Sequence, residues 1–254
     1  MTVSMRMNGD TPSNRIDTVI IDPRYNGPDT SGNGGWVAGS MARLLGTGSV
    51  SVTLRAPAPL AVPMFVRWQD DGSATLHNGG TLIAEAMAAP LQLDLPEAPD
   101  PEEAKAAGML AQKVSAEHGA NWPYARCFSC GFARTDGLRI VPGPVGKDGM
   151  VAATWTPPPL AVSADGQLAV EATWAALDCP AGIAWTHRLG SGTAMVTARI
   201  TAVIDQPLQA GQQYTVIGWP IAQDGRKLHA GTAIFDAAGK VRARSRQLWL
   251  MARA

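Results

Sequence analysis

The stretch Trp36-Val-Ala-Gly-Ser-Met-Ala-Arg-Leu-Leu45 predicts a helix closed by Gly46, a residue type that commonly ends helices. A loop rich in Gly, Asn, Pro, Asp and Ser precedes this helix. The dipeptides Asp71-Gly72 and Asn78-Gly79 mark hairpin turns between the segments that follow. One helix followed by an antiparallel meander predicts an α+β arrangement, in which a sheet wraps around the helix. The four expected strands are residues 50–55, 64–69, 74–77 and 81–86.

The same order of elements recurs in the second half of the chain. A largely apolar stretch at residues 170–185 predicts a helix that is interrupted at Pro180. A short strand is expected before the helix in each half, at residues 18–21 and 150–155. An order that recurs in this way is typical of a duplicated module. The strands expected after the second helix are residues 194–204, 213–219, 227–236 and 240–250.

A third helix is predicted between the two halves. Asp100-Pro101-Glu102-Glu103 is a strong helix start, with Asp as the N-cap and Pro at the first helical position. The helix should run to about His118, and its apolar stripe would consist of Met109, Leu110 and Val114. We therefore expect a flexible tail at residues 1–15, an N-terminal module at 16–95, a linker with a helix at 96–125 and a C-terminal module at 126–254.

Composition excludes several classes of protein. Hydrophobic residues make up 46% of the chain and charged residues 17%, which allows a well-filled core. Lys+Arg and Asp+Glu number 21 each, and a generic nucleic-acid binder needs a surplus of positive charge. No apolar run approaches the length of a membrane span, and the polar start of the chain does not resemble a signal peptide. We expect a cytoplasmic protein that binds no nucleic acid and does not span a membrane. The sequence is compatible with a homo-oligomer.

Two motifs carry a resemblance to a known superfamily. Asn33-Gly34-Gly35-Trp36-Val37-Ala38-Gly39 resembles the Gly-Gly segment that opens the central helix of hotdog thioesterases, many of which have His or Phe in place of Asn33. Cys127-Phe-Ser-Cys130-Gly131, followed by Gly137-Leu138-Arg139-Ile140, is similar to a stretch found in many PaaI-like hotdog thioesterases. Over about residues 18–254 the chain resembles the double-hotdog acyl-CoA thioesterase II type. The resemblance implies a tandem (double) hotdog fold, with two antiparallel sheets each wrapped round a central helix and joined into one continuous sheet.

The same resemblance implies a function and a set of site residues. The thioesterase II family positions the attacking water with an Asp, a Thr and a Gln of its second module, which correspond here to Asp178, Thr197 and Gln247. The matching substrate-binding residues are Asn33, Gly34, Gly35 and Trp36 at the start of the first central helix. The expected substrate is an acyl-CoA or another acyl thioester, and no cofactor is expected.

Two of these assignments have structural alternatives. Bare amides at a helix N-terminus can hydrogen-bond a thioester carbonyl as it gains charge, but Gly34-Gly35 is also compatible with a tight turn into the helix. Asp178 lies in Trp174-Ala-Ala-Leu-Asp-Cys-Pro180, and a carboxylate in so apolar a helix needs hydrogen bonds or a function. The alternative is that Asp178 caps a local helix break at Pro180.

Strand periodicity separates the other two candidates. On the last strand, period two places Gln247 on the face that includes Val241 and Trp249, opposite Arg242, Arg244 and Arg246. A buried amide needs partners, which are either a water and substrate or the protein backbone. Thr197 falls on the face opposite to the apolar one, so that either a bulge turns it inward or the site opens on the other face. The arginine face suggests either a site for CoA phosphates or a solvated outer face.

The cysteines give a weaker signal. Cys127 and Cys130 have the spacing of half a zinc site, but a structural zinc usually needs four ligands and no second Cys-x-x-Cys exists. Because His118 and Cys179 are remote in the sequence, we expect no metal. Cys179 beside Asp178 lacks a local His to activate it as a nucleophile.

The two halves are unequal, which suggests one site per chain. Only the first helix begins with Gly-Gly, and only the second carries a carboxylate in its body. The favoured hypothesis is an acyl-CoA thioesterase with one composite site between the modules. The alternative is a hotdog protein that binds acyl-CoA or an acyl carrier without hydrolysing it. An enoyl hydratase is disfavoured because the four histidines, His77, His118, His187 and His229, do not fit a hydratase pattern.

Overall fold

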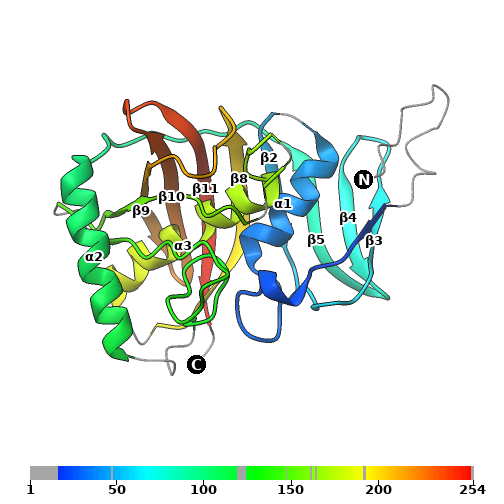
Figure 1. Ribbon diagram of the computed structural model, residues 1–254. Helices are drawn as coiled ribbons and strands as arrows, with labels where there is room; N and C mark the ends of the chain where they lie inside the picture. The colour runs from blue at the N-terminus through cyan, green and yellow to red at the C-terminus, as the bar shows by residue number, and fades with distance from the viewer. Residues whose placement is uncertain are drawn as a thin grey trace.

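In the described part of the chain, all named strands form one 11-stranded sheet in the order β1-β3-β4-β5-β2-β8-β11-β10-β9-β7-β6 (Figure 1). Neighbouring strands pair antiparallel throughout. The strands are β1 (Asp17–Val19), β2 (Val50–Leu54), β3 (Met64–Trp68), β4 (Ala74–Asn78), β5 (Thr81–Ala88), β6 (Gly143–Pro144), β7 (Val151–Trp155), β8 (Met195–Ile204), β9 (Tyr214–Asp224), β10 (Lys227–Asp236) and β11 (Val241–Met251). The computed structural model describes residues 17–46, 48–118, 124–146, 148–160, 162–163, 165–190 and 193–252, so the expected tail at 1–15 lies outside the described residues.

The sheet divides between β2 and β8, where strands from the two halves of the chain meet. Val50 pairs with Ala202 and Val52 with Ile200 across this seam. On one side lie the strands before residue 90, and on the other those after residue 142. The expected hairpin turns are present, and Gly72 and Gly79 adopt the positive φ values that such turns favour. The prediction of one continuous antiparallel sheet is therefore confirmed.

Two helices lie on the same side of this sheet and contact each other (Figure 1). They are α1 (Gly34–Leu45) and α3 (Val170–Leu189), each from one half of the chain. One cluster of buried apolar side chains includes residues of both helices and of strands on both sides of the seam. The two halves therefore share a core. A short 3-10 helix, η2 (Pro23–Tyr25), leads into the loop before α1.

The second central helix is longer and more regular than the sequence indicated. α3 continues through Pro180 to Leu189, so the predicted interruption is wrong. Proline removes one backbone hydrogen bond, but this helix is buried along most of its length. In addition, the Gln247 side chain donates to the carbonyl of Leu177, three residues before the proline. Tertiary packing thus outweighs the local preference of proline.

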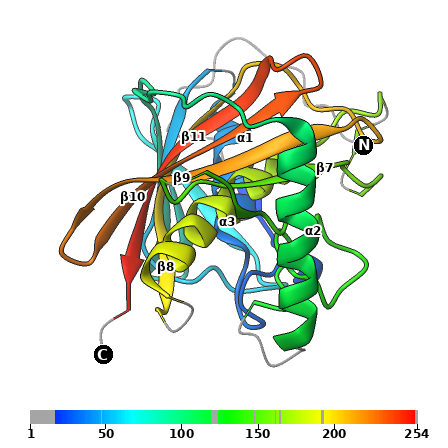
Figure 2. The same ribbon diagram turned by 90° about the vertical axis from the view of Figure 1, so that its left-hand side faces the viewer.

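The connecting helix α2 (Pro101–His118) has the predicted bounds and packs against β6 and β7 at one edge of the sheet (Figure 2). Its buried face differs from the prediction. Met109 and Leu110 are exposed, whereas Ala104 is buried. A Cβ at Gly108 would lie 2.9 Å from the Cβ of Ala153, so small residues set the close contact. Among the described helices, none is long and apolar enough to cross a membrane.

Candidate active site

The carboxylate of Asp178 is the centre of a buried polar network between α1 and α3. Asp178 is 2% exposed. Its Oδ2 accepts hydrogen bonds from the backbone amide of Gly35 at 2.9 Å and from Nδ2 of Asn33 at 3.1 Å. Its Oδ1 accepts from Oγ1 of Thr197 at 2.8 Å. The network thus joins the start of α1 to the body of α3 and to β8, and it does not cap a break at Pro180.

Burial and hydrogen bonding act on this carboxyl group in opposite directions. Burial raises the pKa of Asp178, and the bonds from Thr197, Gly35 and Asn33 lower it. Burial has the larger effect, so that the resulting pKa is raised to about 6. A group with this pKa is mostly ionised at neutral pH and still able to take up a proton. Both properties suit a general base.

Asn33 serves both the helix and the carboxylate. Its Oδ1 accepts from the backbone amide of Trp36 at 2.9 Å, which makes Asn33 the N-cap of α1. This bond fixes the orientation of the amide group, so that Nδ2 faces Asp178. These two contacts explain why an amide can occupy this position.

The two glycines of α1 have different surroundings. A Cβ at Gly35 would lie 2.4 Å from the carbonyl oxygen of Trp174, so only glycine permits this approach of α1 to α3. The Gly35 amide, which we expected at a thioester carbonyl, donates to Asp178 instead. A Cβ at Gly34 would lie 3.3 Å from Oδ2 of Asp178 and 3.3 Å from the Cβ of Thr197. Gly34 and Thr197 are both partly exposed and lie beside the carboxylate.

Thr197 reaches Asp178 because β8 contains a bulge. Trp249 pairs with Thr197 and Leu248 with Arg199, so that Ala198 is the extra residue. The bulge reverses the alternation, and Val196 rather than Thr197 is exposed on the outer face. Of the two explanations that the sequence left open, the structure shows the bulge.

Gln247 is buried on the inner face, as periodicity predicted, but its bonds are to the protein. Its Nε2 donates to the Leu177 carbonyl at 2.6 Å and to Oγ of Ser245 at 2.9 Å. Its Oε1 accepts from the indole of Trp249 at 2.9 Å. These contacts fit the alternative of a buried amide bonded to the protein. The amide binds Leu177, the residue before Asp178, and not Asp178 itself.

Trp36 packs in an aromatic cluster at the start of α1. Its ring stacks on Tyr25 with the centroids 3.4 Å apart, and the edge of Phe128 meets it at 5.2 Å. Trp36 is buried, so in this structure it has the contacts of a core aromatic.

On the outer face of β11, Arg242 and Arg244 form ion pairs with Asp236 and Asp205, as expected of a solvated surface.

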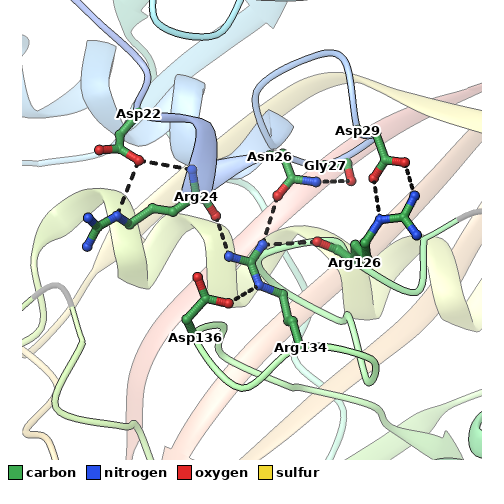
Figure 3. Close-up of polar contacts among 8 residues, drawn as sticks. All are labelled: Asp22, Arg24, Asn26, Gly27, Asp29, Arg126, Arg134 and Asp136. Carbon is green, nitrogen blue, oxygen red and sulfur yellow. Dashed lines mark hydrogen bonds and ion pairs between the residues drawn. The ribbon is translucent and has the colours of Figure 1, made fainter. Parts of the chain in front are cut away.

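Hydrogen bonds and an ion pair join two loops, one from each half of the chain, beside the Asp178 network (Figure 3). The guanidinium of Arg134 donates to Oδ1 of Asn26 at 2.8 Å and to the carbonyl of Arg24 at 2.8 Å. Arg126 forms an ion pair with Asp29. These contacts hold the loop that carries Cys127 against the loop that leads to Asn33.

Several solved structures are similar to this chain over most of its length. A putative thioesterase II from Thermobifida fusca YX is 15% identical with a TM-score of 0.59, covering 97% of this chain and 94% of its own. A protein of unknown function with a hot dog fold from Alicyclobacillus acidocaldarius is 11% identical with a TM-score of 0.60, covering 95% and 94%. The fold is the hotdog fold. An acyl-CoA thioesterase II from Mycobacterium marinum is similar at 15% identity and a TM-score of 0.56, covering 88% and 90%.

These similarities confirm the resemblance to thioesterase II proteins at the level of the fold. Identities this low do not transfer chemistry, because one fold hosts many functions. No model of a known protein family matches the sequence, and no curated protein matches it. Any statement about the reaction therefore depends on the geometry around Asp178.

One feature of the site was not foreseen. Cys179, remote from the other cysteines in the sequence, lies with its Sγ 3.7 Å from that of Cys127. Nδ2 of Asn33 also faces Cys127 Sγ, at 3.7 Å. Only the packing of the Cys127 loop on α3 brings these groups together. No pattern along the chain could have indicated it.

Proposed function

We propose that this chain is a thioester hydrolase acting on acyl-CoA, with one composite site between two hotdog modules at residues 16–95 and 126–254. The observation that carries the proposal is the Asp178 network. Its donors Asn33 and Gly35 come from the first module, and Thr197 comes from the second. A carboxylate buried at a seam and held by three donors is a costly arrangement that suits a reacting group.

The hydrogen bonding of Asp178 leaves room for one more donor. An ionised carboxylate offers about four acceptor directions. Two donors bind Oδ2 and Thr197 binds Oδ1, which leaves a direction on Oδ1 beside the threonine. A water molecule there would donate to Asp178 and could donate a second bond to Thr197 Oγ1, which retains lone pairs. The nucleophilic water would occupy this position.

The reaction then follows from the positions of the groups. Asp178 accepts a proton as the water oxygen forms a bond to the thioester carbon. The N-terminal end of α1, beside the partly exposed Gly34, favours negative charge developing on the carbonyl oxygen. The C–S bond breaks, and the CoA sulfur leaves as thiolate and takes up the proton. The products are a carboxylic acid and free CoA.

Gln247 enters this proposal as a positioning residue. Its amide binds the carbonyl of Leu177, the residue before Asp178, and is itself held by Ser245 and Trp249. Bonds of this kind fix the helix backbone from which the carboxylate projects. The proposal does not require Gln247 to touch the water.

A hydrolysis screen tests the proposal. Acyl-CoAs of increasing chain length should include at least one that is turned over with release of free thiol. A non-hydrolysable acyl-CoA analogue should saturate at one per chain in calorimetry, because only one end of the helix pair carries the network. Tight binding without turnover across the panel would favour a binding protein, and two equal sites per chain would contradict the single composite site.

A further inference from the structure

Three cysteine side chains meet next to the Asp178 network. Cys127 and Cys130 come from the loop at the start of the second module, and Cys179 comes from α3. Their three Sγ atoms all lie within 4.8 Å of one another. Cys127 and Cys179 are buried, Cys130 is partly exposed, and none of the three forms a disulfide. Free thiols that cluster in this way need an explanation beyond core packing.

The loop has the local geometry of a metal-binding turn. In Cys127-x-x-Cys130-Gly131 the two cysteines are three positions apart in one turn. The amide of Gly131 donates to the Cys127 carbonyl at 2.8 Å, and a Cβ at Gly131 would lie 2.3 Å from that oxygen. Glycine therefore closes the turn that holds Cys127 and Cys130 on one short loop.

The sulfur separation agrees with a shared metal ion. A zinc–thiolate bond is about 2.3 Å, so two sulfurs at adjacent corners of a tetrahedron lie about 3.8 Å apart. The observed separation of Cys127 and Cys179 is 3.7 Å. A disulfide needs about 2.0 Å, which would require both side chains to move.

We propose that Cys127, Cys130 and Cys179 bind a zinc ion, with solvent at the fourth position. Thiolates select thiophilic ions such as zinc(II), and three sulfurs within 4.8 Å of one another offer three of its four ligands. The expectation of no metal rested on the number of available ligands and on the distance of Cys179 along the sequence, and the structure removes the second premise.

The ion would act as a clip between the Cys127 loop and α3. The amide of Asn33 contacts the Cys127 sulfur at 3.7 Å and Asp178 Oδ2 at 3.1 Å, so it connects the two groups. By fixing Cys127, the metal would also fix the side chain of Asn33, which donates to the Asp178 carboxylate. This link between the loop and α3 is detectable without any activity.

Elemental analysis of the full chain, purified without chelator from zinc-supplemented cells, is the direct test. We expect about one zinc per chain, and cobalt(II) in its place should give a thiolate charge-transfer band and the visible bands of a tetrahedral ion. Cys127→Ser and Cys179→Ser should each lose the metal. Ser129→Ala is the matched control, since Ser129 is buried in the same turn and supplies no sulfur.

A second measurement on the unaltered chain guards against variants that fail to fold. Titrating the thiols with a mercurial should release zinc, measured with a chelating dye, in step with blocking of the three cysteines. The proposal is overturned if reduced protein reconstituted anaerobically with zinc or cobalt binds neither. A disulfide between any two of the cysteines in anaerobically purified protein would overturn it as well.

Discussion

The two ends of the α1–α3 pair differ, although the same helices form both. The helices run in opposite directions, so that Gly35 lies against Asp178 and Gly39 against Trp174 and Glu171. At the first end the Asp178 carboxylate is buried and bound by three donors. At the second end Glu171 pairs with Arg43 at 2.5 Å, and the Arg43 side chain is 55% exposed.

This difference separates fold from function. Both ends carry a carboxylate on α3, but only Asp178 is held away from any cation by neutral donors. Glu171 has a charged partner at the surface, which is an ordinary arrangement. Packing two helices on a shared sheet thus creates two similar places, and the residues at each place give them different chemical properties.

The largest effect should follow from Asp178→Asn. The change keeps the shape of the side chain but removes the base, so kcat should fall by about 10²-fold or more. Far-ultraviolet circular dichroism and an unfolding curve would establish that the variant folds. Unchanged turnover in the folded variant would rule out Asp178 as the base and make the two helix ends equivalent in function.

A change at Gly35 should act on the fold itself. The new methyl group of Gly35→Ala would lie 2.4 Å from the Trp174 carbonyl and force α1 away from α3. We expect a loss of about 1–3 kcal/mol in the free energy of unfolding, typical of an overpacked core. Gly80→Ala is the matched control, because a Cβ there meets nothing within 4 Å. Equal denaturation midpoints for both variants would contradict this packing argument.

The neighbouring glycine should behave differently. In Gly34→Ala the methyl group would meet side-chain atoms of Leu54, Asp178 and Thr197 at 3.1–3.3 Å, a contact that small shifts can relieve. The fold should survive, but the methyl group would occupy the approach to Asp178. We expect kcat/KM to fall roughly tenfold, as when reacting groups are slightly misplaced. Full activity in Gly34→Ala would mean that substrate reaches Asp178 by another route.

Local patterns predicted the elements well because each depends on a few neighbouring residues. The helix signal at Asp100-Pro101 gave the bounds of α2, and the Asp-Gly and Asn-Gly pairs gave two hairpins. Local patterns failed where a distant part of the chain decides the outcome. Pro180 should have ended a helix, but contacts with β9 and β11 hold α3 together.

The sequence pointed to residues of the Asp178 network but not to the bonds among them. Asp178 and Thr197 came from a resemblance to a family, and the structure brings them within 2.8 Å. The bulge at Ala198 that makes this contact possible depends on the register of β11 on β8, which one strand alone does not reveal. The meeting of Cys179 with Cys127 depends in the same way on how a loop packs on α3.

The smallest effect should come from Glu171→Gln at the other end of the helix pair. Like Asp178→Asn, it turns a carboxylate of α3 into an amide of the same shape, so it is the matched control for that variant. It removes one ion pair whose arginine is 55% exposed and whose glutamate is 12% exposed, and a pair that reaches solvent contributes about 1 kcal/mol and weakens with salt. We expect unchanged kcat and a slightly lower free energy of unfolding, with the difference shrinking at high ionic strength. A loss of turnover as large as that of Asp178→Asn would show that both ends of the pair take part in the reaction, and the contrast between them would fail.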